Sequence, residues 1–122
     1  MSSITQIPNK ATHDEILAAS ATQPTVIYLS SDVLPGCQKF TPAYEALTTR
    51  HPDIKFCQME YSSETSPMFK FAQAQLPVVV LVIEGKWCRT LLSPSLADVE
   101  KGVEELRGKA REFGITEEGR GI

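Results

Sequence analysis

The sequence has few cysteines and few histidines, and their spacing excludes two kinds of site. It contains three cysteines and two histidines in 122 residues. The cysteines are odd in number and widely spaced, so we expect reduced thiols in a cytoplasmic chain and no disulfide framework. His13 and His51 lie in separate polar contexts, with no Cys or His at the spacing of zinc ligands. We therefore expect no metal and no cofactor.

Long hydrophobic runs and blocks of like charge are also missing. The longest apolar run spans residues 76–83, which is far shorter than the ~20 residues of a transmembrane helix. The first residues lack both the basic start and the apolar core of a signal peptide. The formal net charge is −3, and Lys and Arg do not cluster as phosphate binding requires. We expect no contact with a membrane or with nucleic acid.

The periodicity of the apolar residues predicts an alternation of strands and helices. The expected strands are residues 3–7, 25–30, 54–61, 77–83 and 86–92. The expected helices begin at Thr12, Pro35, Ser66 and Ser95. Early strands alternate with helices, which predicts parallel crossovers, and the Glu84-Gly85 turn predicts a closing antiparallel hairpin. The pattern indicates an α/β fold in a single domain.

Capping residues support two of these helix starts, and a proline interrupts the hydrogen bonding of a third helix. Thr12 and Glu15 form a T-x-x-E capping box. Ser66 is a good capping residue, and Pro67 follows it at the favoured first helical position. Pro42 falls inside the helix that begins at Pro35, where it removes a backbone donor. We expect that helix to bend at Pro42.

The stretch PGCQKFTP, residues 35–42, lies where the strand 25–30 passes into a helix. Together with the order of elements, a proline at the head of the hairpin and an EGK turn, it resembles the thioredoxin family from about residue 3 to residue 113. The resemblance implies a thioredoxin fold, in which a mixed five-stranded sheet is flanked by four helices. It also implies a thioredoxin-like domain in residues 1–114, with residues 115–122 as a flexible C-terminal tail.

That family carries a Cys-Gly-Pro-Cys dithiol at this point of the chain, with a proline shortly after the second cysteine. The resemblance matches Cys37 and Pro42 to the second cysteine and its proline, and it places Leu34 at the position of the attacking cysteine. Disulfide exchange needs one thiolate to attack and another thiol to resolve the mixed disulfide. We therefore do not expect a dithiol disulfide reductase.

Three further positions depart from the family's pattern. Tyr28 stands where the family has a buried acid that moves protons for the resolving thiol. Gln58 stands at the position of the lysine that pairs with this acid, and Val33 at that of the loop tryptophan. In another register, Cys37 would be the single nucleophile of a monothiol glutaredoxin-like site. The residues that follow it, QKF, do not match that group's Gly-Phe-Ser, and the upstream strand would lie about one helical turn too far away.

Two interpretations of Cys37 stay open. It would lie in the first turn of a helix, where the helix dipole favours a thiolate, whereas burial behind the loop opposes ionisation. It is either a small apolar filler or a reversible thiol that forms a mixed disulfide with a partner or with glutathione. Cys57 is expected in the core, and Cys88 is expected to be an edge thiol that no neighbour activates.

Leu76-Pro77 matches the family's cis-proline, which faces the active loop and leaves the backbone of Leu76 free to pair with an extended peptide. Around it, the resemblance gathers a candidate partner surface. Its residues are Val33, Leu34, Pro35, Gly36, Leu76, Pro77 and Ser93. Most of them are apolar and are expected to be partly exposed, which is typical of a contact surface. In an alternative arrangement, Leu34 folds inward over Cys37 and shields it.

These observations support two hypotheses about function. The first is a binding module without redox turnover, which holds a peptide or protein partner through the loop 33–36 and Pro77. The second is a monothiol oxidoreductase, in which Cys37 is the catalytic residue and the partner carries a thiol. A third alternative, an enzyme of unrelated chemistry in the same cleft, stays open, although the sequence shows no paired carboxylates, Ser-His-Asp set or phosphate loop that would support it.

Overall fold

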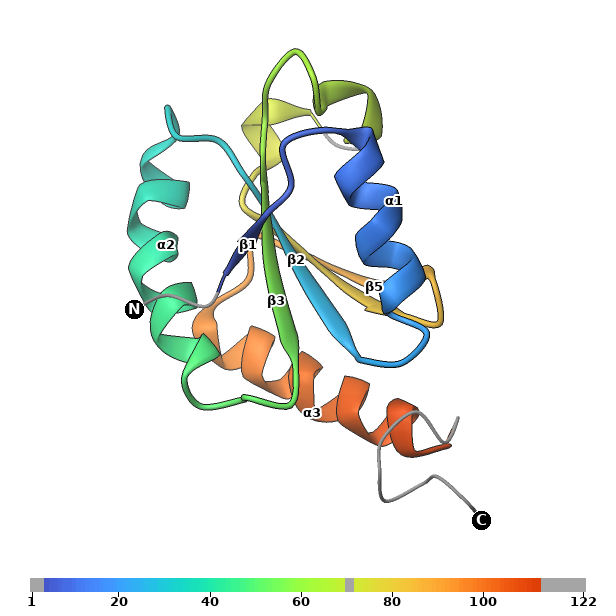
Figure 1. Ribbon diagram of the computed structural model, residues 1–122. Helices are drawn as coiled ribbons and strands as arrows, with labels where there is room; N and C mark the ends of the chain where they lie inside the picture. Colours follow the sequence, from blue (N-terminus) through green and yellow to red (C-terminus); the bar gives the residue numbers. More distant parts are fainter. Residues whose placement is uncertain (1–3, 70–71, 113–122) are drawn as a thin grey trace.

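A computed structural model describes residues 4–69 and 72–112 of the chain (Figure 1). Five strands, three α-helices and two short 3-10 helices follow one another in these ranges. The strands are β1 (Thr5–Gln6), β2 (Thr25–Ser30), β3 (Lys55–Glu60), β4 (Val78–Ile83) and β5 (Lys86–Leu92). The α-helices are α1 (Lys10–Ala19), α2 (Pro35–Thr48) and α3 (Leu96–Glu112), and the 3-10 helices are η1 (Ser66–Met68) and η2 (Gln73–Gln75).

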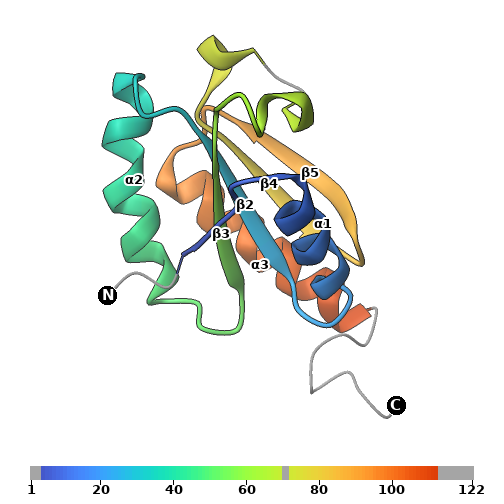
Figure 2. The same ribbon diagram turned by 45° about the horizontal axis from the view of Figure 1, so that its top comes forward.

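The five strands form one mixed sheet in the order β1-β3-β2-β4-β5. β1 and β2 both run parallel to β3, whereas β4 runs antiparallel to its two neighbours β2 and β5. Helices α2 and α3 pack on one face of this sheet and α1 packs on the other (Figure 2). The mixed five-stranded sheet expected from the sequence is confirmed.

The central strands β2 and β4 are buried along their whole length. In β4, Val79, Leu81 and Ile83 face α2 and α3, while Val78, Val80 and Val82 face α1. β-branched residues favour the extended backbone, and a strand that is covered on both faces has no polar side to alternate with. This is why an uninterrupted apolar run becomes the middle of the sheet.

The first helix begins earlier than the sequence predicted. Asn9 is its N-cap, and the Asn9 side chain accepts a hydrogen bond from the backbone N–H of Thr12 at 2.9 Å. The expected capping box at Thr12 and Glu15 is therefore wrong, because Asn9 satisfies the same backbone donor one turn earlier. His13 and Ile16 are the residues that α1 buries.

The fourth helix expected from Ser66 is absent from the described part of the chain, where η1 and η2 take its place. Thr65 explains part of the difference. Its hydroxyl donates to the carbonyl oxygen of Glu60 at 2.6 Å and accepts from the backbone N–H of Ser62 at 3.0 Å. Such side-chain hydrogen bonds to nearby backbone compete with a helix and favour short turns.

Other local predictions are confirmed. Glu84 and Gly85 form the hairpin turn with φ values of 51° and 78°, the left-handed conformation that a two-residue turn between twisted strands requires. The hydroxyl of Ser95 accepts from the backbone N–H of Asp98 at 3.2 Å, as expected for a cap of α3. Pro42 lies inside α2, and the bend expected there stays a prediction.

The predicted tail, residues 115–122, lies outside the described residues, and so does the end of the predicted domain. Within the ranges 4–69 and 72–112, no helix combines the length and the apolar character needed to cross a membrane.

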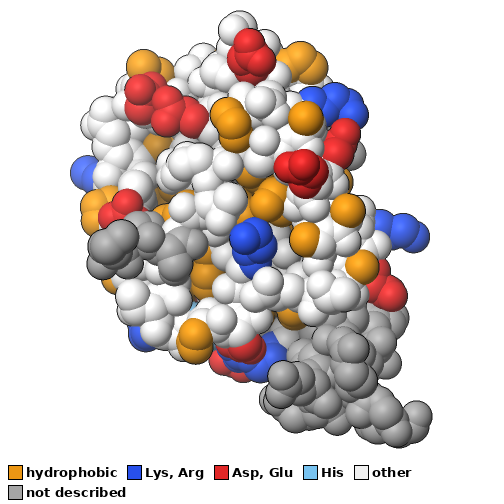
Figure 3. Space-filling view, viewed as in Figure 1, with side chains coloured by type: hydrophobic (Ala, Val, Ile, Leu, Met, Phe, Trp, Pro, Cys, Tyr) orange, Lys and Arg blue, Asp and Glu red, His pale blue; other side chains and the backbone are white. Residues whose placement is uncertain are grey.

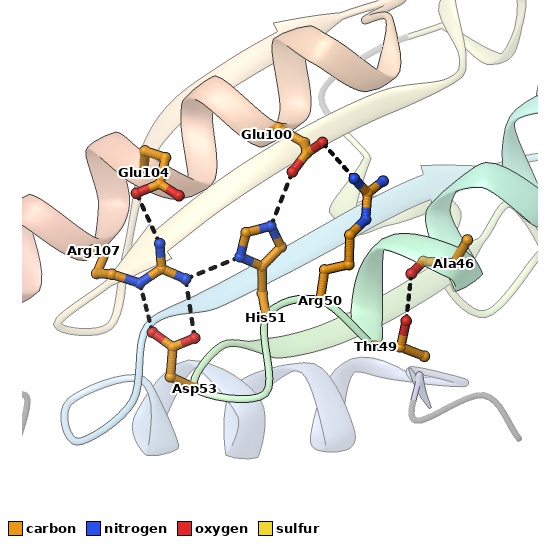
Figure 4. Close-up of polar contacts among 8 residues, drawn as sticks. All are labelled: Ala46, Thr49, Arg50, His51, Asp53, Glu100, Glu104 and Arg107. Carbon is orange, nitrogen blue, oxygen red and sulfur yellow. Dashed lines mark hydrogen bonds and ion pairs between the residues drawn. The ribbon is translucent and has the colours of Figure 1, made fainter.

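A network of charged side chains joins α3 to the connection between α2 and β3 (Figure 4). Arg107 donates two hydrogen bonds to Asp53, from Nε to Oδ2 at 2.7 Å and from Nη2 to Oδ1 at 3.0 Å. Its Nη2 also lies 3.0 Å from Nδ1 of His51, whose Nε2 lies 3.2 Å from Oε1 of Glu100. Because a guanidinium can only donate, Nδ1 of His51 is the acceptor and Nε2 the donor.

Replacing Arg107 with Gln should change how stability responds to acid. The hydrogen bond from Arg107 lowers the pKa of Asp53 below its usual value. An acid with a lowered pKa stabilises the fold above its unfolded pKa of about 4 and loses this effect as the pH falls through the folded value. The pair is partly exposed, so we expect a loss of about 1 kcal/mol or less at pH 7.

Urea unfolding of both proteins between pH 7 and pH 2.5 measures this effect. The difference between wild type and Arg107→Gln should shrink below about pH 4, where Asp53 becomes protonated. Lys39→Gln is the matched control, because it removes the same charge from an exposed side chain that forms no ion pair in the described ranges, and its effect should not change with pH. A difference that stays constant with pH would contradict the role given to the Arg107–Asp53 pair.

Candidate functional site

The candidate site lies where β2 passes into α2. Leu34 is the N-cap residue of α2, with an extended backbone (φ −96°, ψ 126°) and no capping side chain. Pro35 follows in the first turn, where its fixed φ suits a helix and its missing N–H costs nothing. The residues between Ser30 and Pro35 therefore connect the end of β2 to a helix start whose backbone is fixed by proline.

Three chain segments meet at this end of the sheet. A Cβ atom placed on Gly36 would lie 3.6 Å from Cδ of Pro77. The peptide bond between Leu76 and Pro77 is cis, and the carbonyl oxygen of Pro77 accepts from the backbone N–H of Ser93 at 2.9 Å. Ser93 has a φ of 43°. The structure thus brings the loop 33–36, Pro77 and Ser93 together, as the sequence predicted.

The residues of the expected partner surface differ widely in exposure. Val33 is 68% exposed, and Pro35, Gly36 and Ser93 are also exposed. Leu34 and Pro77 are half-buried. Leu92, which the sequence reasoning did not select, is 59% exposed at the end of β5, directly before Ser93. An apolar residue that ends an edge strand beside a predicted site is the signal that could have identified it.

Leu76 does not behave as predicted. It is buried, and its backbone N–H donates to the carbonyl oxygen of Gln73 at 3.2 Å, which closes η2. The expectation that Leu76 is partly exposed is therefore wrong. The expectation that its backbone is free to pair with a peptide is wrong for its N–H group. The short 3-10 helix that replaces the expected helix uses the N–H group that an added peptide strand would need.

Cys37 is buried beneath the loop. It is 2% exposed, and its Sγ lies 3.5 Å from the backbone nitrogen of Ser31, which donates to it. Leu34 packs against the apolar cluster that contains Cys37. The arrangement agrees with the alternative in which Leu34 folds inward and shields the thiol.

The other two cysteines are placed as predicted and do not pair with Cys37. All three cysteines are free thiols. Burial raises the pKa of Cys57 to about 11. Cys57 pairs with Ile27 in the sheet, whereas Cys37 contacts Ser31 beyond the end of the same strand. Four residues along a strand correspond to about 13 Å, too far for a disulfide.

Cys88 is the exposed thiol of the three and lies on the edge strand β5. The pairing of β4 with β5 shifts between Leu81 and Val82, which leaves Cys88 as the extra residue of a bulge. Its Sγ donates to the carbonyl oxygen of Leu81 at 3.2 Å. Partial burial raises the pKa of the Cys88 thiol, so the structure does not activate it.

Tyr28 is bound to the backbone of Cys37. It is fully buried, and its hydroxyl donates to the carbonyl oxygen of Cys37 at 3.0 Å. The ring centroid of Tyr28 lies 5.1 Å from that of Phe40 and 4.9 Å from that of Tyr44. Burial raises the pKa of Tyr28 far above its usual value. Its hydroxyl therefore stays protonated near neutral pH and cannot take a proton from the thiol.

Gln58 is tied to the same strand end. Its Nε2 donates to the hydroxyl of Ser30 at 2.9 Å and so joins β3 to the end of β2. The sequence predicted that Tyr28 and Gln58 replace a proton-moving pair, and both are held in hydrogen bonds that serve the fold. The backbone N–H of Ser31 donates to the sulfur of Cys37. In the described part of the chain, no ionisable side chain forms a hydrogen bond with this sulfur.

A crevice of about 340 Å³ opens beside Cys37, between the end of the sheet and α2. Asp32 and Glu60 both line it. Burial and the neighbouring Asp32 raise the pKa of Glu60. The sequence reasoning found no paired carboxylates, because these two residues are far apart in the chain. The parallel register, which pairs Ser30 with Glu60, brings them together.

Comparison with known proteins supports the fold. No family model and no curated protein matches the sequence. Among solved structures, thioredoxin f from spinach chloroplast is 17% identical with a TM-score of 0.75, covering 87% of this chain and 95% of that one.

Thioredoxin f2, in its complex with ferredoxin:thioredoxin reductase, is also 17% identical, with a TM-score of 0.78, covering 86% of this chain and 96% of that one. Fasciola hepatica thioredoxin is 14% identical with a TM-score of 0.74, covering 84% of this chain and 98% of that one. The protein has the thioredoxin fold, with three α-helices in its described part where the sequence predicted four.

Labelling of the native protein with iodoacetamide should separate the three thiols. We expect Cys88 to react first at pH 8, because it is exposed, and Cys37 and Cys57 to react slowly, because both are buried. Leu34→Ala should accelerate labelling of Cys37 about tenfold or more by opening the cover over the sulfur. Peptide mass spectrometry reads each site.

Val33→Ala is the matched control, because it removes a similar amount of hydrocarbon from the same loop but from an exposed side chain. It should leave the labelling of Cys37 unchanged. Fast labelling of Cys37 in the unmodified protein would show that Leu34 does not shield the thiol.

Proposed function

We propose that this chain is a thioredoxin-fold binding module without dithiol turnover, which holds a peptide or protein partner at the end of the sheet. The residues of this partner surface are Val33, Leu34, Pro35, Gly36, Pro77, Leu92 and Ser93. The observation that carries the proposal is the burial of the Cys37 thiol in an apolar cluster, against which Leu34, the N-cap residue of α2, also packs.

The chemistry around Cys37 supports the absence of turnover. Dithiol exchange needs a second thiol beside the first, and Cys57 belongs to a different part of the sheet, about 13 Å along the strand. The tyrosine behind Cys37 keeps its proton, so it supplies no base. A thiol that has neither a resolving partner nor a proton acceptor cannot complete the reaction by itself.

Exposed apolar side chains support the binding role. Val33 and Leu92 are the exposed large hydrophobic residues in the described part of the chain. Both lie at the same end of the sheet, because Val78 pairs with Leu29 at the end of β2 and with Leu92 at the end of β5. Solvent-exposed apolar groups that gather at one place favour a contact surface.

Proteins of this fold do hold protein partners. Thioredoxin f2 was solved in complex with ferredoxin:thioredoxin reductase. We propose by analogy that the end of the sheet also receives a protein or peptide here, with contacts made mainly by side chains because the N–H of Leu76 is already bonded.

A second candidate function is a single-thiol redox protein. The observation that favours it is the position of Cys37 among the residues that line the crevice. In this reaction, the thiolate of Cys37 would attack a glutathionylated partner, take over the glutathione and release the partner's thiol. Free glutathione would then attack the Cys37–glutathione disulfide, which restores Cys37 and releases glutathione disulfide.

A library of random dodecapeptides displayed on phage tests the binding role. We expect selection on the wild-type protein to enrich peptides that bind Val33. Val33→Asp should weaken their affinity about tenfold or more, because an apolar contact worth about 1.5 kcal/mol is lost. Fluorescence titration of the synthesised peptides measures this change.

Ala21→Asp adds the same charge to an exposed residue at the other end of β2 and should leave the affinity unchanged. Failure to enrich any peptide, or equal binding by wild type and Val33→Asp, would contradict the proposed surface.

A further inference from the structure

Two carboxylates line the same crevice next to the proposed partner surface. Asp32 directly precedes the exposed Val33, and Glu60 ends the neighbouring strand β3. Both residues are exposed, and in the described ranges neither forms an ion pair with Lys, Arg or His. In the space-filling view, acidic side chains gather at the upper left, over the connection between β2 and α2 (Figure 3).

Three side chains that line the crevice beside these carboxylates already donate hydrogen bonds within the protein. The side-chain nitrogen of Gln38 donates to the carbonyl oxygen of Asp32 at 2.7 Å, and that of Gln58 donates to Ser30 at 2.9 Å. The hydroxyl of Thr41 donates to the carbonyl oxygen of Cys37 at 2.9 Å. A crevice in which these three side chains already donate within the protein, and which two carboxylates line, suits a ligand group that is rich in donors and positively charged.

The two carboxylates oppose each other when no cation is present. Burial and the nearby Asp32 carboxyl hold the pKa of Glu60 above its usual value, so the negative charge of Glu60 is disfavoured in the free protein. A cation between the two groups would reverse this cost. The pair therefore favours partners that bring positive charge to this point.

We propose that the partner places a Lys or Arg side chain between Asp32 and Glu60, next to an apolar residue that packs on Val33. This inference rests on the proposed function, because it describes the partner of the same surface. The crevice of about 340 Å³ leaves room for one long basic side chain. Arginine fits better than lysine, because its planar fork can donate to two carboxylates at once.

The dodecapeptides selected on the wild-type protein provide the test. We expect Lys or Arg beside a large apolar residue about threefold more often than in the starting library, as charge complementarity favours. Asp32→Asn/Glu60→Gln should weaken the affinity of these peptides about tenfold, which corresponds to about 1.4 kcal/mol. Raising the salt concentration should reduce the difference between the two proteins.

Two controls isolate the contact. Glu15→Gln/Glu45→Gln removes the same number of exposed charges elsewhere and should leave the affinity within about twofold of wild type. Replacing the arginine of a selected peptide with citrulline, which has nearly the same shape and no charge, should weaken binding to the wild-type protein by the same factor as the double variant. This second measurement does not depend on how the variants fold.

The outcomes separate this inference from the proposed function. Peptides that lose affinity for Val33→Asp but show no basic preference, and bind Asp32→Asn/Glu60→Gln as tightly as wild type, would overturn this inference and leave the binding surface intact. Equal weakening by the Glu15/Glu45 control would also overturn it, because the attraction would then come from net charge. If no peptide is enriched, both proposals fail.

Discussion

Leu34 packs against the cluster around Cys37 at the point where β2 passes into α2, and the chemistry of the whole loop depends on this contact. A thiol at the first turn of a helix gains from the positive end of the helix dipole. That advantage requires access to the sulfur, and Cys37 is buried. Burial therefore makes the Cys37 thiol part of the apolar core.

The interior behind the loop is consistent with this change. The hydroxyl of Tyr28 donates to the carbonyl oxygen of Cys37, and its ring packs against Phe40 and Tyr44. A buried aromatic ring adds apolar contact area and needs one hydrogen bond for its hydroxyl, which it finds here. The same residues thus stabilise the start of α2 and supply no ionised group near the thiol.

Local sequence patterns predicted most of the fold, since β4 reads as a buried strand from its composition and the Glu84-Gly85 turn from its residue types. They failed where a hydrogen bond outside the motif decided the outcome. The side chain of Asn9 accepts the hydrogen bond from the N–H of Thr12 that the expected capping box would have satisfied. The hydroxyl of Thr65 stabilises turns in place of a helix. Helix propensity describes a short segment by itself. The position of these helix ends and turns depends on which side chain forms a hydrogen bond with the backbone.

The candidate site was also predicted only in part from the sequence. The resemblance identified the loop 33–36, Pro77 and Ser93, but the Asp32–Glu60 pair arises only from the register of β2 and β3. A single buried thiol with no thiol beside it cannot turn over disulfides by itself, and a catalytic assay of insulin disulfide reduction with dithiothreitol as the electron source tests this most directly. We expect a background rate for the unmodified protein and a clear gain for Leu34→Cys. Reduction by the unmodified protein at a rate above background that grows with its concentration would contradict it.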